Sequence, residues 1–241
     1  MPSSTRTATS NHLIAALPGK DRQHLLANCE QVELVFADII SEPGERIRHV
    51  YFPTDSFISL VTPIDGRASL EVGMVGNEGM VGIALILGVN NSPLYSLVQG
   101  SGPAWRMTAA LFFKELKCSV ALQREMKRYL YVLMIQLAQT AACTRFHVVE
   151  ARLARWLLMT RDRAHSGEFH ITQEFLAYML GVRRVGVTKA ACALQKRELI
   201  SYTRGNMTIL DNAGLEAAAC GCYHADKETY QRFLCPRKIA A

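Results

Sequence analysis

Residues 171–210, ITQEFLAYMLGVRRVGVTKAACALQKRELISYTRGNMTIL, decide the fold. Thr172 is a typical N-cap residue, apolar residues follow it at helical spacing, and Gly181 stands where a left-handed C-cap is favoured. We therefore expect a first helix that ends near Leu180 and a second helix over about residues 183–197.

The second helix is predicted to be amphipathic, because its apolar residues recur at i, i+3, i+4 and i+7 and its cations fall mostly elsewhere. The apolar set is Val187, Ala190, Ala191 and Leu194, and the cations are Arg183, Arg184, Lys189, Lys196 and Arg197. Two helices joined by a short glycine-containing turn are typical of the helix-turn-helix motif, whose second helix enters the DNA major groove.

Two β-prone runs, residues 199–203 and 207–210, follow the helix pair. The segment Arg204-Gly205-Asn206 between them favours a tight hairpin. We expect a wing that carries Arg204 at its tip, beside the DNA phosphates.

The distribution of charge along the chain distinguishes a DNA-binding helix pair from two amphipathic helices that only pack against each other. Residues 145–210 contain 11 Lys or Arg and 5 Asp or Glu, whereas the rest of the chain contains 16 of each sign. The net charge of +6 therefore falls in the proposed DNA-binding part. Release of counterions from a phosphate backbone favours such a distribution.

The composition of the 241 residues, 49% hydrophobic and 20% charged, is that of a well-packed globular protein. No apolar run reaches the roughly 20 residues that cross a bilayer, and the first residues lack the apolar centre of a signal peptide. We therefore expect a cytoplasmic protein without a membrane partner.

The seven cysteines form no CxxC pair and no spacing typical of zinc or iron–sulfur ligands. We expect reduced thiols, no metal and no cofactor; the alternative is a thiol cluster of Cys220, Cys222 and Cys235.

The first hundred residues favour short strands separated by Pro, Gly, Asp and Asn, which is typical of a β-roll or barrel. The expected strands are residues 32–36, 50–52, 57–62, 69–74 and 94–99. Candidate turns between them include Gly100-Ser101-Gly102-Pro103.

From about residue 109 the apolar period becomes helical. The residues Leu122, Met126, Leu130, Leu133, Leu137 and Ala141 recur at nearly the 3.5-residue period of a coiled-coil seam. A helix of about 24 residues extends roughly 36 Å, which is longer than packing on a roll requires. We expect dimerisation along this seam, and the alternative is a helix buried against its own roll. A further amphipathic helix is expected over residues 149–160, before a polar loop at residues 163–167.

This order of elements, together with LGVRRVGVTKAACALQKRELI (residues 180–200), resembles the Crp/Fnr family of bacterial transcription regulators. The resemblance covers about residues 13–223 and, in the roll, rests on strand order and GMVGNEGMVG (residues 73–82). It implies an α+β fold with a cyclic-nucleotide-binding-like β-roll, a long dimerisation helix and a winged helix-turn-helix. The expected divisions are a disordered tail at 1–12, the roll at 13–118, the dimerisation helix at 119–145, the DNA-binding domain at 146–223 and a tail at 224–241.

The resemblance also implies a homodimeric transcription regulator that binds an inverted repeat in double-stranded DNA and contacts RNA polymerase. Arg184 and Lys189 stand at the family's base-reading and later basic positions, but Val185 replaces the acidic residue. Because valine cannot accept a hydrogen bond from cytosine and instead favours a thymine methyl, we expect a different operator. The candidate DNA-contacting residues are Arg183, Arg184, Val185, Thr188, Lys189, Arg204 and Thr172.

The sequence does not identify the effector. The segment Gly76-Asn77-Glu78-Gly79 only faintly resembles the family's cyclic-nucleotide loop, and residues 68–105 contain no Lys or Arg to hold a phosphate. The family's N-terminal iron–sulfur cluster lacks ligands here, since Cys29 is the only cysteine of the first hundred residues. A haem on His49 or Cys118 is a weaker alternative.

Two other classes of function remain alternatives. A β-roll metal enzyme needs a pair of histidines and a carboxylate, whereas the roll offers His49 with Glu71 and Glu78, and the chain carries none of the common catalytic motifs. We therefore expect no enzyme. A ligand-binding or scaffold protein would use the helix pair for protein contacts, and the uneven charge argues against it.

Overall fold

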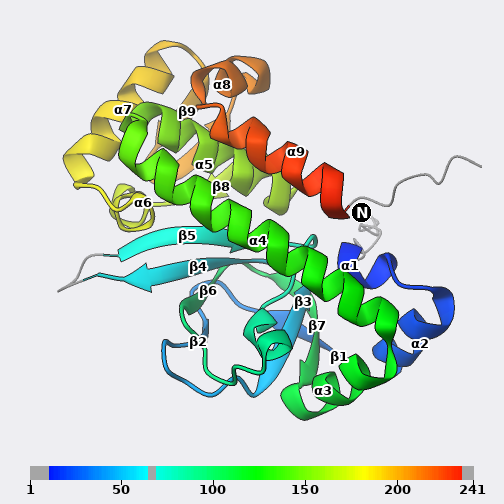
Figure 1. Ribbon diagram of the computed structural model, residues 1–241. Helices are drawn as coiled ribbons and strands as arrows, with labels where there is room; N and C mark the ends of the chain where they lie inside the picture. The colour runs from blue at the N-terminus through cyan, green and yellow to red at the C-terminus, as the bar shows by residue number, and fades with distance from the viewer. Residues whose placement is uncertain (1–10, 65–68, 235–241) are drawn as a thin grey trace, which may run out of the picture.

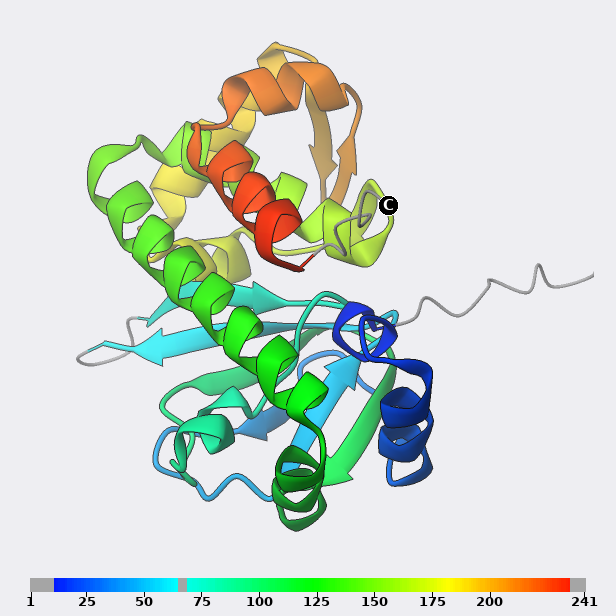
Figure 2. The same ribbon diagram turned by 45° about the vertical axis from the view of Figure 1, so that its right-hand side comes forward.

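The computed structural model describes residues 11–64 and 69–234. An amino-terminal β-roll lies below a smaller helical domain, and one long helix runs along the front of both (Figures 1 and 2). Among the described residues, no helix is both long enough and apolar enough to span a membrane.

The roll consists of two antiparallel sheets preceded by two helices. Its elements are α1 (His12–Ala15), α2 (Gly19–Ala27), β1 (Glu30–Leu34), β2 (Ile39–Ser41), β3 (His49–Pro53), β4 (Phe57–Pro63), β5 (Ser69–Val75), the 3-10 helix η1 (Ile83–Leu87), β6 (Tyr95–Gly100) and β7 (Gly102–Thr108). The strand orders are β1-β7-β3 and β2-β6-β4-β5.

All five expected strands are present, with shifts of one or two residues at their ends. The sequence missed β2 and β7. The sequence does not indicate the start of β7, because Gly102 and Pro103 are typical turn residues. In the structure these two residues already pair with Leu34 and Glu33 of β1.

Two helices connect the roll to the second domain, α3 (Ala109–Cys118) and the 27-residue α4 (Val120–Phe146). The α4 helix begins where the Ser119 hydroxyl accepts a hydrogen bond from the Leu122 amide at 3.0 Å.

The inner face of α4 corrects part of the predicted dimerisation seam. Leu122, Met126 and Leu133 are only 1%, 0% and 8% exposed, because they pack into the roll of their own chain. They are not available to a partner, so this part of the seam was wrong. Leu130 and Leu137 remain half-buried, and Ala141 is exposed.

The second domain contains α5 (Val149–Ala164), β8 (Glu168–His170), α6 (Gln173–Leu180), α7 (Arg184–Lys196), β9 (Ile200–Thr203), β10 (Asn206–Ile209) and α8 (Asn212–Ala218). One core joins the inner faces of α5, α6 and α7 to the small sheet through side chains such as Leu157, Leu176, Leu194 and Met207, all at most 1% exposed. The sheet order is β8-β10-β9, and the sequence did not predict β8.

The last described element is the helix α9 (Cys222–Leu234), which corrects the expected tail at 224–241. It lies along α4 (Figure 2) and contacts it through Tyr131 and Phe233, whose rings pack edge to face at 4.9 Å. Tyr223 and Leu234 are 1% and 6% exposed, so the apolar side of α9 is buried and holds it as a helix. Residues 235–241 lie outside the described residues, as do residues 1–10 of the expected amino-terminal tail.

The two domains touch directly where α5 and α6 lie on the β4–β5 edge of the roll (Figure 1). The indole N–H of Trp156 on α5 donates to Glu71 of β5 at 3.0 Å. Nearby, a partly buried ion pair joins Arg163 of α5 to Glu78 at 2.6 Å. Polar groups of the roll therefore fix the position of the smaller domain.

Candidate nucleic-acid interface

The α6–α7 pair has the geometry that the sequence predicted. The Thr172 hydroxyl accepts a hydrogen bond from the Phe175 amide at 3.1 Å and so begins α6. Gly181 ends α6 in the left-handed region at φ +62°. The Cβ of any other residue at position 181 would lie 3.1 Å from a methyl carbon of Leu70, so the turn is also a close approach to the roll.

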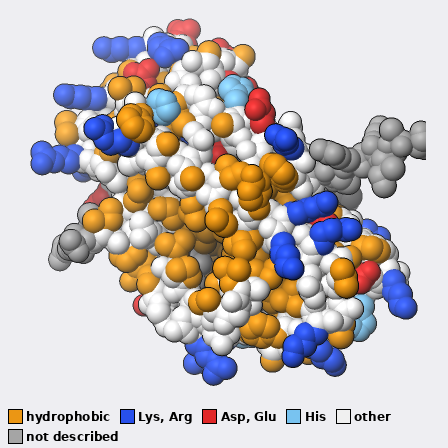
Figure 3. Space-filling view, viewed as in Figure 1, with side chains coloured by type: hydrophobic (Ala, Val, Ile, Leu, Met, Phe, Trp, Pro, Cys, Tyr) orange, Lys and Arg blue, Asp and Glu red, His pale blue; other side chains and the backbone are white. Residues whose placement is uncertain are grey.

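The α7 helix turns one face into the domain core and the other to solvent. Its four predicted core residues are Val187, Ala190, Ala191 and Leu194, at 0%, 5%, 1% and 0% exposure. The side chains of Arg184, Val185, Lys189, Cys192 and Lys196 are exposed. Figure 3 shows Lys and Arg side chains gathered at the upper left, over the position of α6 and α7 in Figure 1.

The first turn of α7 presents unshielded positive charge. Arg183 is its N-cap residue, and no side chain caps the helix. The amides of a helix N-terminus and the partial positive charge of the helix dipole attract anions. In the part of the chain that the structure describes, no ion pair involves Arg183, Arg184 or Lys189. These cations are available to phosphates or bases.

Thr188 differs from the other candidates, because its hydroxyl is already engaged. It donates to the side-chain oxygen of Gln173 at 2.7 Å, and it also lies 3.1 Å from the Arg184 carbonyl. Gln173 is the first residue of α6. Thr188 therefore fixes α7 to the start of α6.

The hairpin between β9 and β10 forms the expected wing, with a turn shorter than the sequence indicated. Its two central residues, Arg204 and Gly205, have φ of +51° and +86°, as type I′ turns require, and Asn206 already belongs to β10. The Gly205 carbonyl accepts from the Ile171 amide at 2.7 Å, which ties the turn to the residue before the α6 cap. Arg204 is exposed at the tip.

The structure divides the basic residues of this domain into two groups. Arg152 and Arg155 of α5 are 8% and 6% exposed, and Arg155 and Arg163 form ion pairs of 2.6 Å with Asp226 and Glu78. These arginines stabilise the interior of the protein. Because Asp226 and Glu78 lie outside residues 145–210, the charge count of that segment overstated its basic surface. Residues 183–204 still contain six Lys or Arg and one Glu, all exposed.

Comparison with known proteins agrees with this geometry. The model of the Crp-like helix-turn-helix domain matches residues 151–218. The chain therefore contains a Crp-like helix-turn-helix domain.

The fold comparison covers most of the chain. A putative transcriptional regulator of the crp/fnr family from Eubacterium rectale is 17% identical, with a TM-score of 0.68 over 86% of this chain and 96% of that one. FixK2 from Bradyrhizobium japonicum is 13% identical, with a TM-score of 0.67 over 80% and 98%. The c-di-GMP responsive global regulator CLP from Xanthomonas campestris is 14% identical, with a TM-score of 0.66 over 80% and 100%. None of the curated proteins that were compared is significantly similar in sequence.

The roll contains a groove of about 480 Å³ between α4 and the β2–β6 side of the sheet, visible as a hollow in Figure 3. Most of its lining is apolar, and His49 lies at its wall beside Arg46 and Arg48. The loop at residues 76–79 is not part of this lining. Its Glu78 instead holds Arg163 of the DNA-binding domain, so the loop has a structural partner of its own.

Proposed function

We propose that this Crp/Fnr protein is a cytoplasmic homodimer that binds an inverted repeat in double-stranded DNA and regulates transcription. The observation that carries the proposal is the solvent face of α7, where Arg184 and Lys189 have no ion-pair partner among the described residues and flank the exposed side chain of Val185. An amphipathic helix with this surface fits the major groove with its first turns against base edges.

Each candidate residue has a role that follows from its chemistry. Arg184 donates two hydrogen bonds to O6 and N7 of a guanine, and Val185, 59% exposed, contacts a thymine methyl group. Lys189 and Arg183 contact phosphates on either side of the groove. Thr172, at the start of α6, and Arg204, at the tip of the wing, contact the backbone further out.

The dimer interface is proposed on the side of α4 next to the buried seam, at the mouth of the groove in the roll. Leu130, Met134, Leu137 and Ala141 recur at intervals of four, three and four residues, and Met134 is 59% exposed. An apolar band follows α4 across the centre of Figure 3. Two such helices packed together would place two copies of α7 about one DNA turn apart, roughly 34 Å. A contact with RNA polymerase follows from the family alone.

The proposal is tested by fluorescence anisotropy with labelled duplex DNA over a range of salt concentrations. The wild type is expected to bind, with an affinity that falls steeply as salt rises. The triple variant Arg183→Ala, Arg184→Ala, Lys189→Ala should lose most of this binding. A matched control removes three exposed cations from the roll, Lys20→Ala, Arg22→Ala and Lys117→Ala, and should bind nearly as the wild type does. Equal losses in the two triple variants would mean that binding reflects net charge and not the α7 surface.

A further inference from the structure

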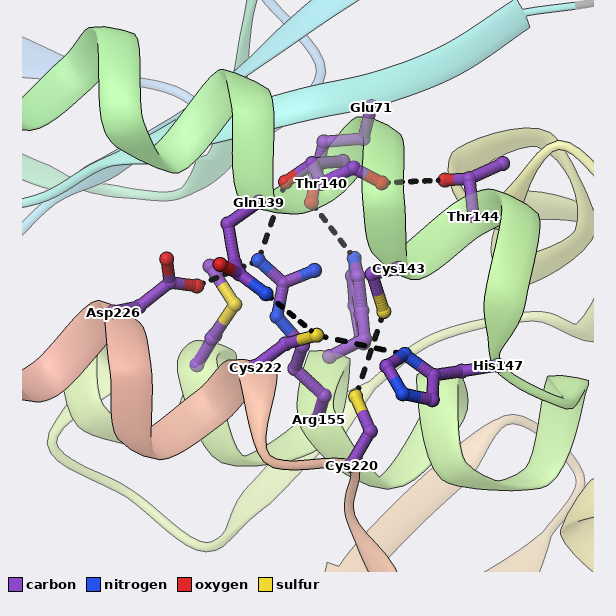
Figure 4. Close-up of polar contacts among 12 residues, drawn as sticks. Glu71, Gln139, Thr140, Cys143, Thr144, His147, Arg155, Cys220, Cys222 and Asp226 are labelled. Atoms are coloured by element: carbon purple, nitrogen blue, oxygen red, sulfur yellow. Dashed lines mark hydrogen bonds and ion pairs between the residues drawn. The ribbon is translucent and has the colours of Figure 1, made fainter.

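Four side chains capable of binding a metal converge where α4 meets the link between α8 and α9. They are Cys143 and His147 at the end of α4, Cys220 in the link and Cys222 at the start of α9. Their ligand atoms all lie within 4.8 Å of one another. In Figure 4 the three sulfur atoms and the imidazole point toward one another from three separate segments of the chain.

Two of the distances between these atoms match those around a single tetrahedral ion. Zinc bonds of about 2.3 Å to sulfur and about 2.0 Å to nitrogen place neighbouring ligand atoms about 3.5 to 3.8 Å apart in a tetrahedron. The Sγ atoms of Cys143 and Cys220 lie 3.5 Å apart, and Cys222 Sγ lies 3.5 Å from His147 Nδ1. A cluster of several iron atoms would hold its ligands further apart than this.

A hydrogen-bond donor and two arginines lie around the three cysteine sulfur atoms. The three cysteines are 1%, 7% and 2% exposed and form a small cluster of their own. The side-chain amide of Gln139 donates to Cys222 Sγ at 2.9 Å. A Zn²⁺ ion with three thiolates carries one net negative charge, and Arg155 and Arg152 stand close enough to act electrostatically on Cys143. Because Arg155 already pairs with Asp226, Arg152 is the cation that would balance the charge of a filled site.

We propose that Cys143, His147, Cys220 and Cys222 bind one Zn²⁺ ion. Three thiolates and one imidazole are a ligand set that zinc prefers in structural sites, and the fully protein-bound tetrahedron leaves no open position for catalysis. Each thiol releases its proton to solvent on binding, His147 binds through neutral Nδ1, and no electron is transferred.

The ion would join three separate segments of the chain. His147 is the C-cap residue of α4, just before the bend into α5, and Cys220 and Cys222 flank Gly221, whose surroundings are open. The ion would fix the start of α9 against α4, at the opposite end from the Tyr131–Phe233 contact. The site is thus a structural clamp across the bend between the long helix and the DNA-binding domain.

The sequence does not predict a metal here, and the reason is physical. Cys220-x-Cys222 supplies two ligands, and the third cysteine, Cys143, lies 77 residues before Cys220. Only the packing of α9 against α4 brings the two pairs together. Cys235, which the sequence analysis grouped with Cys220 and Cys222, lies outside the described residues.

The test is the zinc content of the full-length protein, purified under reducing conditions without chelator and measured by plasma mass spectrometry. About one zinc per chain is expected for the wild type and for Cys118→Ser, a control at an exposed thiol on α3. Cys143→Ser and Cys222→Ser should contain none. Since His147 is exposed, His147→Ala is expected to fold and to bind zinc more weakly than the wild type.

Cobalt provides a second readout that is independent of DNA binding. Co²⁺ added to the metal-free wild type should give the visible bands of a tetrahedral ion and a thiolate charge-transfer band, both absent in Cys222→Ser. Gln139→Ala should retain the bands but weaken the affinity roughly 10-fold, because it removes the hydrogen bond to the ligand sulfur. Reduced wild-type protein that takes up neither zinc nor cobalt, or that carries a Cys143–Cys220 disulfide and remains metal-free after reduction, would overturn the proposal.

Discussion

Glu71 makes the contact between the two domains sensitive to pH. This carboxyl group is 7% exposed, lies between the Ser59 hydroxyl and the Trp156 indole, and interacts electrostatically with Arg163 and Arg155. Burial outweighs these favourable partners and raises the pKa of Glu71 from 4.5 to about 7. Near neutral pH the folded protein therefore holds a proton that the unfolded chain releases.

The sign and size of the effect follow from this difference. Between pH 4.5 and 7 the folded state binds more protons than the unfolded state, so the free energy of unfolding falls as pH rises through this range. A shift of 2.5 pKa units corresponds to about 3 kcal/mol at and above pH 7. For a chain of this size that is roughly 6–12 °C in melting temperature.

The substitution Glu71→Gln tests this reasoning, because the amide has the same shape and remains neutral at every pH. The variant should be nearly as stable as the wild type at pH 5 and more stable at pH 8, as measured by calorimetry at both values. Glu33→Gln, which makes the same chemical change at an exposed position of β1, should follow the wild type. Parallel pH profiles for wild type and Glu71→Gln, or a less stable variant at pH 8, would refute the reasoning.

Three further predictions concern DNA binding and assembly. Arg184→Ala should cost roughly 1–3 kcal/mol on the preferred operator and relax the preference at one base pair per half-site, which competition with single-base variants measures; equal losses on every sequence would contradict base reading. Arg204→Ala should weaken binding about equally on all sequences and lower the salt slope by about one, as measured by anisotropy titrations. A change in sequence preference would instead mean that Arg204 contacts bases and not only the phosphate backbone. Met134→Glu should dissociate the dimer in sedimentation velocity, whereas Met134→Leu should leave it intact, and a dimeric Met134→Glu protein would place the interface elsewhere.

The DNA-binding motif was predictable because its signals are local. Thr172, Gly181 and the spacing of Val187 to Leu194 each fix a feature within a few residues, and the structure shows the cap, the turn and the buried face where expected. The hairpin was likewise found from Arg204-Gly205, although its turn is one residue shorter.

Features that depend on distant segments were not predictable in the same way. The α4 helix has apolar residues on two sides, and its sequence period does not show that Leu122 and Met126 face the roll while Met134 faces solvent. The role of Arg155 as an interior residue depends on Asp226 of α9, a helix that itself forms against α4. The cysteine and histidine cluster was missed because its members meet only after these helices have packed.

The measurement that tests the central claim most directly is selection of bound sequences from a pool of random duplex DNA by the full-length protein at physiological salt. The account predicts an inverted repeat whose half-site centres lie about 10 base pairs apart, as two recognition helices related by a two-fold axis require. Recovery of sequences with no shared motif, or of a single half-site without its inverted partner, would contradict the proposed dimeric reading of DNA by α7.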